Sequence, residues 1–350
     1  MIAARSYAFR PGFRLRIRGA PGVLEHFDAE YGSAAVPEGE DVQLELVFGD
    51  PLDRRGGDLL IRGGHKTVGW QVALSSADAD PLRACVHLSG RPRSFGLSLV
   101  QGYFLEPLLS VAASRTGLVL LPSAAVAVDG EALLLVGRSR TGKSSLSVRA
   151  AAAGRPVLGD DQILLDDSGR CGAFPRRLRF YSDLRETAPA AYARLPRSVQ
   201  TALTLRRILK LVTRGFAAPP VRVPLSLFGP PPPPAPLPLL RIAVIRRSSS
   251  VAELETAELP TDRAVEEALD VLAEQRFQLA AAGDPDWHDA LAETIERERA
   301  ILAVAFADRP VLGVSVPDQW SAPRAIAALA DLLGTERAVT RDDEPRDRRG

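Results

Sequence analysis

The chain has 350 residues, of which 46% are hydrophobic and 25% are charged, a balance that is typical of a globular protein with a sizeable core. The formal net charge of +1 gives no general attraction to nucleic acid or to a membrane surface, so neither is an expected partner. The two cysteines, Cys85 and Cys171, form no metal-binding or disulfide pattern and indicate a reducing compartment. The N-terminus lacks the apolar core of a signal peptide, and no apolar run reaches the length of a transmembrane helix, so we expect a cytoplasmic protein.

The first part of the chain, residues 1–105, is predicted to be a β-rich region. Hydrophobic and polar residues alternate at 13–18 and at 42–47, which is the pattern of half-buried strands. No motif in this region indicates a role. Residues 101–115 are expected to form a helical connection to the next unit.

A phosphate-binding pattern follows two apolar runs. Residues 124–128 and 132–136 are joined by Asp129-Gly130, which predicts a tight β-hairpin. The next segment reads GRSRTGKS and matches the Walker A pattern G-x-x-x-x-G-K-[ST] at every required position. A helix of small residues then ends at Gly154, so strand, loop and helix occur in the order of a P-loop.

Each required residue of this motif has a chemical reason. Gly137 and Gly142 let the backbone curl so that its N–H groups point at an anion, and Lys143 brings a compact positive charge to the phosphates. Ser144 offers a hydroxyl to Mg²⁺. Lys143 is one of only three lysines among 44 basic residues, which indicates that a point charge is needed there.

The motif defines the expected cofactors, ATP and Mg²⁺. The side chains of Arg138 and Arg140 either project outward or cover the phosphates as a lid. The expected nucleotide-binding residues are Gly137, Arg138, Ser139, Arg140, Thr141, Gly142, Lys143, Ser144 and Ser145.

Asp160 and Asp161 form the second half of the predicted site. They follow the short strand 157–158, which can run beside the loop-bearing strand and bring both acids to the same edge of the sheet. Adjacent residues of an extended chain point in opposite directions, so one carboxylate can face Mg²⁺ while the other faces an acceptor hydroxyl. Three arginines follow in the segment PRRLRF. Either they lie on a solvated basic strand edge, or one of Arg176, Arg177 and Arg179 neutralises the transferring phosphoryl group.

The remaining chain is predicted to alternate helices and strands. An amphipathic helix at 199–216 is expected to dock on the core with a solvated basic face, with docking to a partner as the alternative. The segment 229–238, GPPPPPAPLP, predicts a stiff linker. Further strands are predicted at 240–245 and 311–316, and further helices at 261–281, 286–307 and 322–334. The four histidines have no metal-ligand spacing and are expected to be structural.

The expected fold class is α/β (α+β), with a mixed β-sheet and flanking helices around a P-loop nucleotide-binding core. This core domain is expected to span residues 106–335, after the β-rich region 1–105 and before a disordered charged tail at 336–350.

The segment 121–166 resembles the core of the HPr kinase/phosphorylase family, in which a strand–turn–strand, a P-loop and a helix precede a GHRLxADD-like segment. Here that last segment is GRPVLGDD, Gly154 to Asp161. The resemblance implies a fold like that of phosphoenolpyruvate carboxykinase and transfer of the γ-phosphoryl group of ATP to a serine or other hydroxyl. It also implies that Asp160 is the general base, acting with Lys143, and that Asp161 binds Mg²⁺ with Ser144, although these two carboxylate roles could be exchanged.

The sequence departs from the family before the loop. The family usually has a His at the start of the preceding strand, where this chain has Pro122 or Ser123, and neither residue titrates near neutral pH as His does. This difference argues against reverse, phosphorylase-type chemistry and for an acceptor other than the family's phosphocarrier protein.

Similar accessory kinases occur with peptide-natural-product machinery. The resemblance therefore makes a hydroxyl-bearing peptide or protein, including a peptide precursor, the expected partner, and a homo-oligomer is possible. Two alternatives stay open: a nucleotide-dependent switch or scaffold that binds ATP without transferring phosphate, and a plain ATPase.

Overall fold

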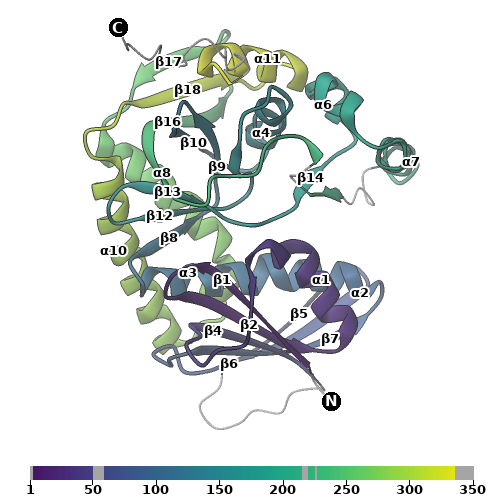
Figure 1. Cartoon of the computed structure of the whole chain (residues 1–350), viewed down its shortest axis with the longest axis vertical. Helices are drawn as coiled ribbons and strands as arrows, with labels where there is room; N and C mark the ends of the chain where they lie inside the picture. Colours follow the sequence, from purple (N-terminus) through teal and green to yellow (C-terminus); the bar gives the residue numbers. More distant parts are fainter. Residues whose placement is uncertain (1–2, 50–58, 215–219, 225–226, 336–350) are drawn as a thin grey trace, which may run out of the picture.

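The computed structural model describes residues 3–49, 59–214, 220–224 and 227–335. The chain forms two layered units, with the N-terminal unit packed against the lower end of a larger second unit (Figure 1). The tail predicted from residue 336 lies outside the described residues.

The N-terminal unit is a seven-stranded sheet with the order β3-β1-β2-β4-β7-β6-β5. Its strands are β1 (Ala3–Arg10), β2 (Phe13–Gly19), β3 (Ala35–Val36), β4 (Leu44–Phe48), β5 (Leu59–His65), β6 (Val68–Leu74) and β7 (Leu82–Gly90). The helix α1 (Pro21–Tyr31), the short 3-10 helix η1 (Gly32–Ala34), α2 (Arg93–Val100) and α3 (Glu106–Ser114) complete the unit, since the core side chains of α3 belong to the same hydrophobic cluster as its strands. The strands predicted from alternation are confirmed, because Phe13, Leu15 and Ile17 of β2 point into the core.

One continuous helical segment leads out of this unit. It consists of α2, a π-helical turn η2 (Gln101–Leu105) and α3 (Glu106–Ser114). The domain boundary expected between residues 105 and 106 lies inside this segment. By length and composition Arg93–Ser114 could cross a membrane, but 72% of its apolar window is buried inside the protein. Every residue of α3 is buried because α3 packs between the two sheets, so the segment is in the environment of a core helix.

The second unit contains a nine-stranded mixed sheet. Its main order is β11-β9-β10-β16-β13-β12-β8, and β18 pairs with β16 and β17 with β18. The strands are β8 (Leu118–Leu121), β9 (Ala124–Val128), β10 (Glu131–Val136), β11 (Val157–Gly159), β12 (Ile163–Asp166), β13 (Arg170–Ala173), β16 (Leu237–Ser248), β17 (Glu255–Glu258) and β18 (Val311–Pro317). The three strands β10, β16 and β18 run parallel to one another.

Helices cover both faces of this sheet. The helices of this unit are α4 (Lys143–Ala152), α5 (Leu184–Thr187), α6 (Pro189–Arg194), α7 (Arg197–Val212), α8 (Thr261–Gln275), α9 (Phe277–Ala280), α10 (Pro285–Phe306) and α11 (Ala322–Leu333). Leu134 and Val136 of β10 share a core cluster with α8 and α10, whereas Leu133 and Leu135 share one with α4 and α11. Burial on both faces explains the uninterrupted apolar run of β10. The expected mixed α/β class with flanking helices is confirmed.

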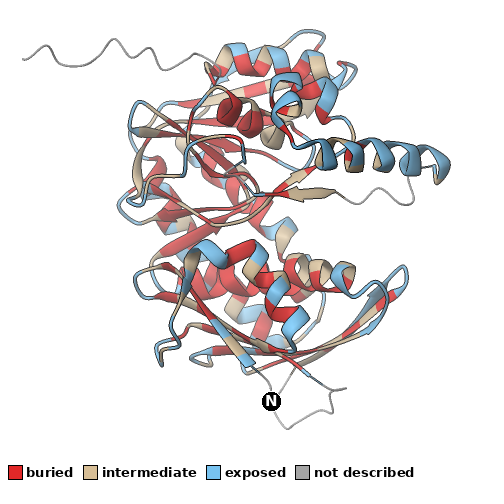
Figure 2. Cartoon of the chain, turned by 45° about the vertical axis from the view of Figure 1, so that its right-hand side comes forward, coloured by how far each residue is buried: buried red, intermediate tan, exposed pale blue. Residues whose placement is uncertain are grey.

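A small two-stranded sheet, β14 (Leu178–Phe180) paired with β15 (Val221–Val223), lies beside the second unit. The helices α5, α6 and α7 form the excursion between these two strands. The expectation that the helix at 199–216 docks on the core is wrong: α7 ends at Val212, and Leu203 is its only buried residue. The helix projects from the body and is exposed over most of its surface (Figure 2).

The proline-rich linker predicted at 229–238 ends earlier than expected. Residues 230–236 form neither helix nor strand, as expected for a linker. β16 already begins at Leu237, and Pro238 faces Arg170 of β13 at the edge of the pairing. The last two residues of the predicted linker therefore belong to a strand.

Candidate functional site

The loop between β10 and α4 is shaped by a hairpin and two glycines. Asp129 and Gly130 have φ angles of 51° and 84°, as a tight two-residue hairpin turn requires, and β9 and β10 pair antiparallel around them. A Cβ on Gly137 would lie 2.5 Å from the carbonyl oxygen of Ile245 in β16. Gly142 has a φ of 106°, and a Cβ there would collide with Ile326 of α11. Both glycines are needed for the loop to pass this close to its neighbours.

Lys143 is folded under the loop. Its Nζ donates hydrogen bonds to the carbonyl oxygens of Gly137 and Arg138, the latter at 3.0 Å. Thr141 Oγ1 donates to the same Arg138 carbonyl at 3.0 Å, which braces the loop. Burial lowers the pKa of Lys143, while the charges of Asp161, Asp160 and Glu274 act in the opposite direction. The loop therefore encloses a cation at the first residue of α4.

The remaining loop residues lie outside this enclosure. Arg138 forms ion pairs with Glu274 at 3.0 Å and Asp270 at 3.7 Å, so its side chain points away from the loop towards α8. Ser139 and Arg140 are exposed, and Ser145 in the first turn of α4 is half-buried.

Asp160 and Asp161 follow β11 at the edge of the sheet. β11 pairs with β9 and not with the loop-bearing strand β10, so the expectation that the two strands lie side by side is wrong. Because β9 is antiparallel to both, β10 and β11 nevertheless run in the same direction. Their carboxyl ends meet at one edge of the sheet, which brings the two acids to the loop.

Asp160 points towards the start of α4. It is only 7% exposed, and its carboxylate lies beside the hydroxyls of Ser144 and Ser147. Its Oδ1 is buried and has no hydrogen-bond partner among the residues that the structure describes. Burial, together with the charge of Asp161, raises the pKa of Asp160 to about 7, against the effects of Ser144 and Lys143.

The surroundings of Asp160 fit a magnesium ion. A buried carboxylate oxygen that lacks a partner, beside a serine hydroxyl, supplies two of the hard oxygen ligands that Mg²⁺ takes, and Mg²⁺ usually completes its shell with water and phosphate. In the part of the chain that the structure describes, no cluster of three or more His, Cys, Asp or Glu side chains could hold a metal ion.

Asp161 points the other way, towards the arginines of the segment after β13. Its Oδ2 lies 3.4 Å from Arg176 and 3.5 Å from Arg179. The expectation of a solvated basic strand edge is wrong, because the side chains of Arg176, Arg177 and Arg179 are 6%, 25% and 26% exposed and all form ion pairs. Arg177 does not join Asp161: it pairs with Glu30 of α1 at 2.7 Å.

Two residues near Asp161 were not predicted from the sequence. Glu106 of α3 pairs with Arg176 at 3.1 Å, and burial raises its pKa to about 7 while Arg176 acts in the opposite direction. Tyr181 follows β14 and is 53% exposed. A single acid inside the apolar helix 101–114 is the one sequence signal for Glu106, whereas no pattern indicates Tyr181.

The chain matches none of the protein-family models with which it was compared, and no curated protein is significantly similar to it in sequence. The chemistry of the site therefore has to be inferred from its own residues.

Proposed function

We propose that the protein is an ATP- and Mg²⁺-dependent kinase that transfers the γ-phosphoryl group to a hydroxyl of a peptide, a protein or a small molecule. One observation carries the proposal: Lys143, Ser144 and Asp160 converge at the start of α4, where a buried oxygen of Asp160 has no partner among the described residues. A cation, a hydroxyl and a carboxylate beside a helix N-terminus form the set of groups that a P-loop offers to a magnesium nucleotide.

The loop would bind the phosphates of ATP. The first N–H groups of α4 have no partner within the helix and carry the positive end of its dipole. The ammonium of Lys143 now bonds to two loop carbonyls, and it can exchange them for phosphate oxygens without leaving the loop. Gly137 and Gly142 keep the backbone open to the phosphates.

Ser144 and Asp160 would hold Mg²⁺. A bound Mg²⁺ supplies positive charge that neutralises the phosphate oxygens. This placement exchanges the two carboxylate roles of the resemblance, because Asp160 is the acid that touches Ser144. Asp161 is then the carboxylate for the acceptor hydroxyl, and its side chain is the more accessible, at 31% exposed.

Asp161 would orient the acceptor hydroxyl and take its proton. Arg179 lies 3.5 Å from this carboxylate and is 26% exposed, so it can turn towards the phosphoryl group as negative charge develops there. The acceptor approaches from the exposed side, past Tyr181.

Mass spectrometry tests the proposal directly. The protein is incubated with ATP labelled with ¹⁸O at the γ-phosphate, Mg²⁺ and a peptide and metabolite extract, and hydroxyl compounds are searched for the labelled phosphate. A labelled product from the wild-type protein supports a kinase. Nucleotide binding without a product supports the switch, and release of labelled inorganic phosphate alone supports the ATPase.

Two variants separate the carboxylate roles. Asp161→Asn is expected to bind Mg²⁺–ATP normally and to lose roughly 10²–10⁴-fold in transfer rate, as expected when a general base is removed. Asp160→Asn is expected to need a higher Mg²⁺ concentration for nucleotide binding. The opposite result, a metal defect in Asp161→Asn and a pure transfer defect in Asp160→Asn, would restore the assignment that the family resemblance implies.

A further inference from the structure

We propose that the N-terminal unit completes the candidate site: Glu106 of α3 holds Arg176, and Arg176 in turn positions Asp161. The proposal rests on the proposed kinase function and adds a role for the first unit of the chain. Glu106 and Arg176 are positioning residues, since neither is required to touch the nucleotide or the acceptor.

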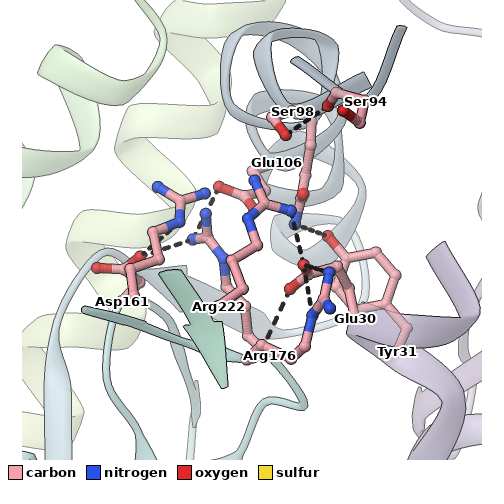
Figure 3. Close-up of polar contacts among 11 residues, drawn as sticks. Glu30, Tyr31, Ser94, Ser98, Glu106, Asp161, Arg176 and Arg222 are labelled. Atoms are coloured by element: carbon pink, nitrogen blue, oxygen red, sulfur yellow. Dashed lines mark hydrogen bonds and ion pairs between the residues drawn. The ribbon is translucent and has the colours of Figure 1, made fainter. Parts of the chain in front are cut away.

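A single guanidinium nitrogen bridges the two carboxylates. Nη1 of Arg176 lies 3.1 Å from Oε2 of Glu106 and 3.4 Å from Oδ2 of Asp161. The side chains of Arg176 and Glu106 are only 6% and 4% exposed. Figure 3 shows the Asp161 side chain on one side of Arg176 and Arg222, and Glu30 and Tyr31 on the other. The three charges therefore form a line from a helix of the first unit to the site.

Burial makes this line rigid. A buried arginine cannot replace a lost carboxylate with water, so removing one member leaves an uncompensated charge. The other two guanidinium nitrogens of Arg176, Nε and Nη2, have no hydrogen-bond partner in the described part of the chain, so the guanidinium depends on Glu106 and Asp161. Glu106 is held in place because α3 is buried along its whole length, and its ion pair with Arg176 therefore fixes the position of the guanidinium. Asp161 is anchored at the end of this arrangement and is the only member that reaches the exposed side.

A neighbouring pair provides a natural control. Arg177 and Arg222 both pair with Glu30 of α1, at 2.7 and 2.6 Å. These contacts fasten the β14–β15 sheet to the first unit, as the Glu106 contact does, but they do not touch Asp161. A purely structural role would make Arg176 and Arg177 equivalent, whereas a positioning role would distinguish them.

The experiment compares Arg176→Met with Arg177→Met in the full chain. Three quantities are measured: the Kd of Mg²⁺–ATP, the kcat and KM of transfer to the acceptor found by mass spectrometry, and the thermal unfolding midpoint. Both variants are expected to unfold at a lower temperature. Only Arg176→Met is expected to lose at least 10-fold in kcat, with an unchanged Kd for Mg²⁺–ATP.

A double variant separates the positioning role from a purely structural one. In the Asp161→Asn background, Arg176→Met is expected to cause no further loss of kcat, because Arg176 acts through the carboxylate that is already absent. Should Arg176→Met fail to fold, Glu106→Gln replaces it, since it keeps the side-chain volume and a hydrogen-bond acceptor. Glu106→Gln is expected to lower kcat about 3- to 10-fold.

The outcomes distinguish this proposal from the proposed function. Equal kcat values for Arg176→Met and Arg177→Met, or losses that multiply in the double variant, contradict the positioning role while the kinase stands. A wild-type protein that neither binds Mg²⁺–ATP nor transfers phosphate contradicts the proposed function, and the positioning role falls with it.

Discussion

At the scale of single residues, Gly159 lets the chain turn from β11 into the acidic pair. A Cβ at this position would collide with the backbone carbonyl oxygen of Gln162, which cannot move aside as a flexible side chain can. We expect Gly159→Ala to lower the free energy of unfolding by roughly 1–3 kcal/mol, the usual cost of overpacking. Urea denaturation measures it. Gly22→Ala is the control, because a Cβ there meets no atom of the described residues within 4 Å. Equal stability of the two variants would contradict this account of the turn.

His26 gives a pH dependence at the same scale. Burial, and then the charges of Arg222 and Arg177, lower the pKa of His26 to about 4. Glu30 and Gln101 act in the opposite direction. As the pH falls from 6.5 towards 4, the unfolded chain therefore binds a proton that the folded protein does not, so His26 makes folding less favourable. At about 1.4 kcal/mol per pH unit, the effect is at most about 3.5 kcal/mol.

The contribution of His26 is measured as a difference. Glu106 and Asp160 have pKa values raised to about 7, and they act in the opposite direction, since the folded protein keeps their protons longer. Urea denaturation of the wild type and of His26→Gln at pH 7 and pH 5 isolates the histidine. We expect the wild type to lose more stability than the variant between these pH values. Parallel losses would show that His26 titrates normally in the folded protein.

At the scale of elements, α7 differs most from its sequence expectation. Its apolar residues have the helical period that normally marks a core-facing side, but Leu211 and Val212 are 71% and 76% exposed. We expect Leu211→Gln and Val212→Thr each to change the free energy of unfolding by less than about 0.5 kcal/mol. Leu203→Ala, at the one buried position of the helix, is expected to cost about 2–3 kcal/mol. A large loss for the exposed positions in urea denaturation would mean that α7 packs on the body in solution.

The elements that the sequence predicts well are those specified by local chemistry. The hairpin at Asp129-Gly130, the apolar strand β10 and the helix ending near Gly154 depend on turn residues and periodicity within a short window. The pairing of β11 with β9 depends on contacts between segments that are distant in the chain, and the hydrophobic periodicity of each segment does not predict such contacts. The same limit explains α7, because an apolar face does not reveal whether a partner surface exists within the chain.

The candidate site divides in the same way. Lys143 and the acidic pair are recognisable from motif spacing, since a phosphate loop requires particular residue types at fixed positions. Which side chains Asp160 and Asp161 contact depends on how β11 approaches the loop. Only the three-dimensional structure shows this approach. Glu106 lies far from the motif along the chain and contacts Arg176, which in turn contacts Asp161, so no local pattern could predict this pairing.

At the scale of the whole molecule, the two units share a hydrophobic core. Phe174 of the second unit packs on Phe9 and Tyr31 of the first, with ring centroids 4.7 and 5.8 Å apart. Arg10 also pairs with Asp166 at 2.8 Å across the same boundary. A shared core predicts that the units unfold together.

Calorimetry tests this cooperativity. We expect one thermal transition for the full chain, and we expect Phe174→Ala to lower the midpoint of the whole transition, with a loss of about 3–5 kcal/mol. Two separate transitions, with only one shifted by Phe174→Ala, would mean that the units are energetically independent. That result would also weaken the case that Glu106 stabilises a site in the second unit.

The loop around Lys143 is proposed to bind the phosphates of ATP, and isothermal titration calorimetry with Mg²⁺–ATP measures this binding. The chain offers a matched control, because Lys210 is an exposed lysine on α7. We expect the wild type and Lys210→Met to bind with the same affinity and Lys143→Met to bind at least about 100-fold more weakly, a loss of about 3 kcal/mol. Unchanged binding by Lys143→Met, or no binding by the wild type, would contradict the proposed role of the loop.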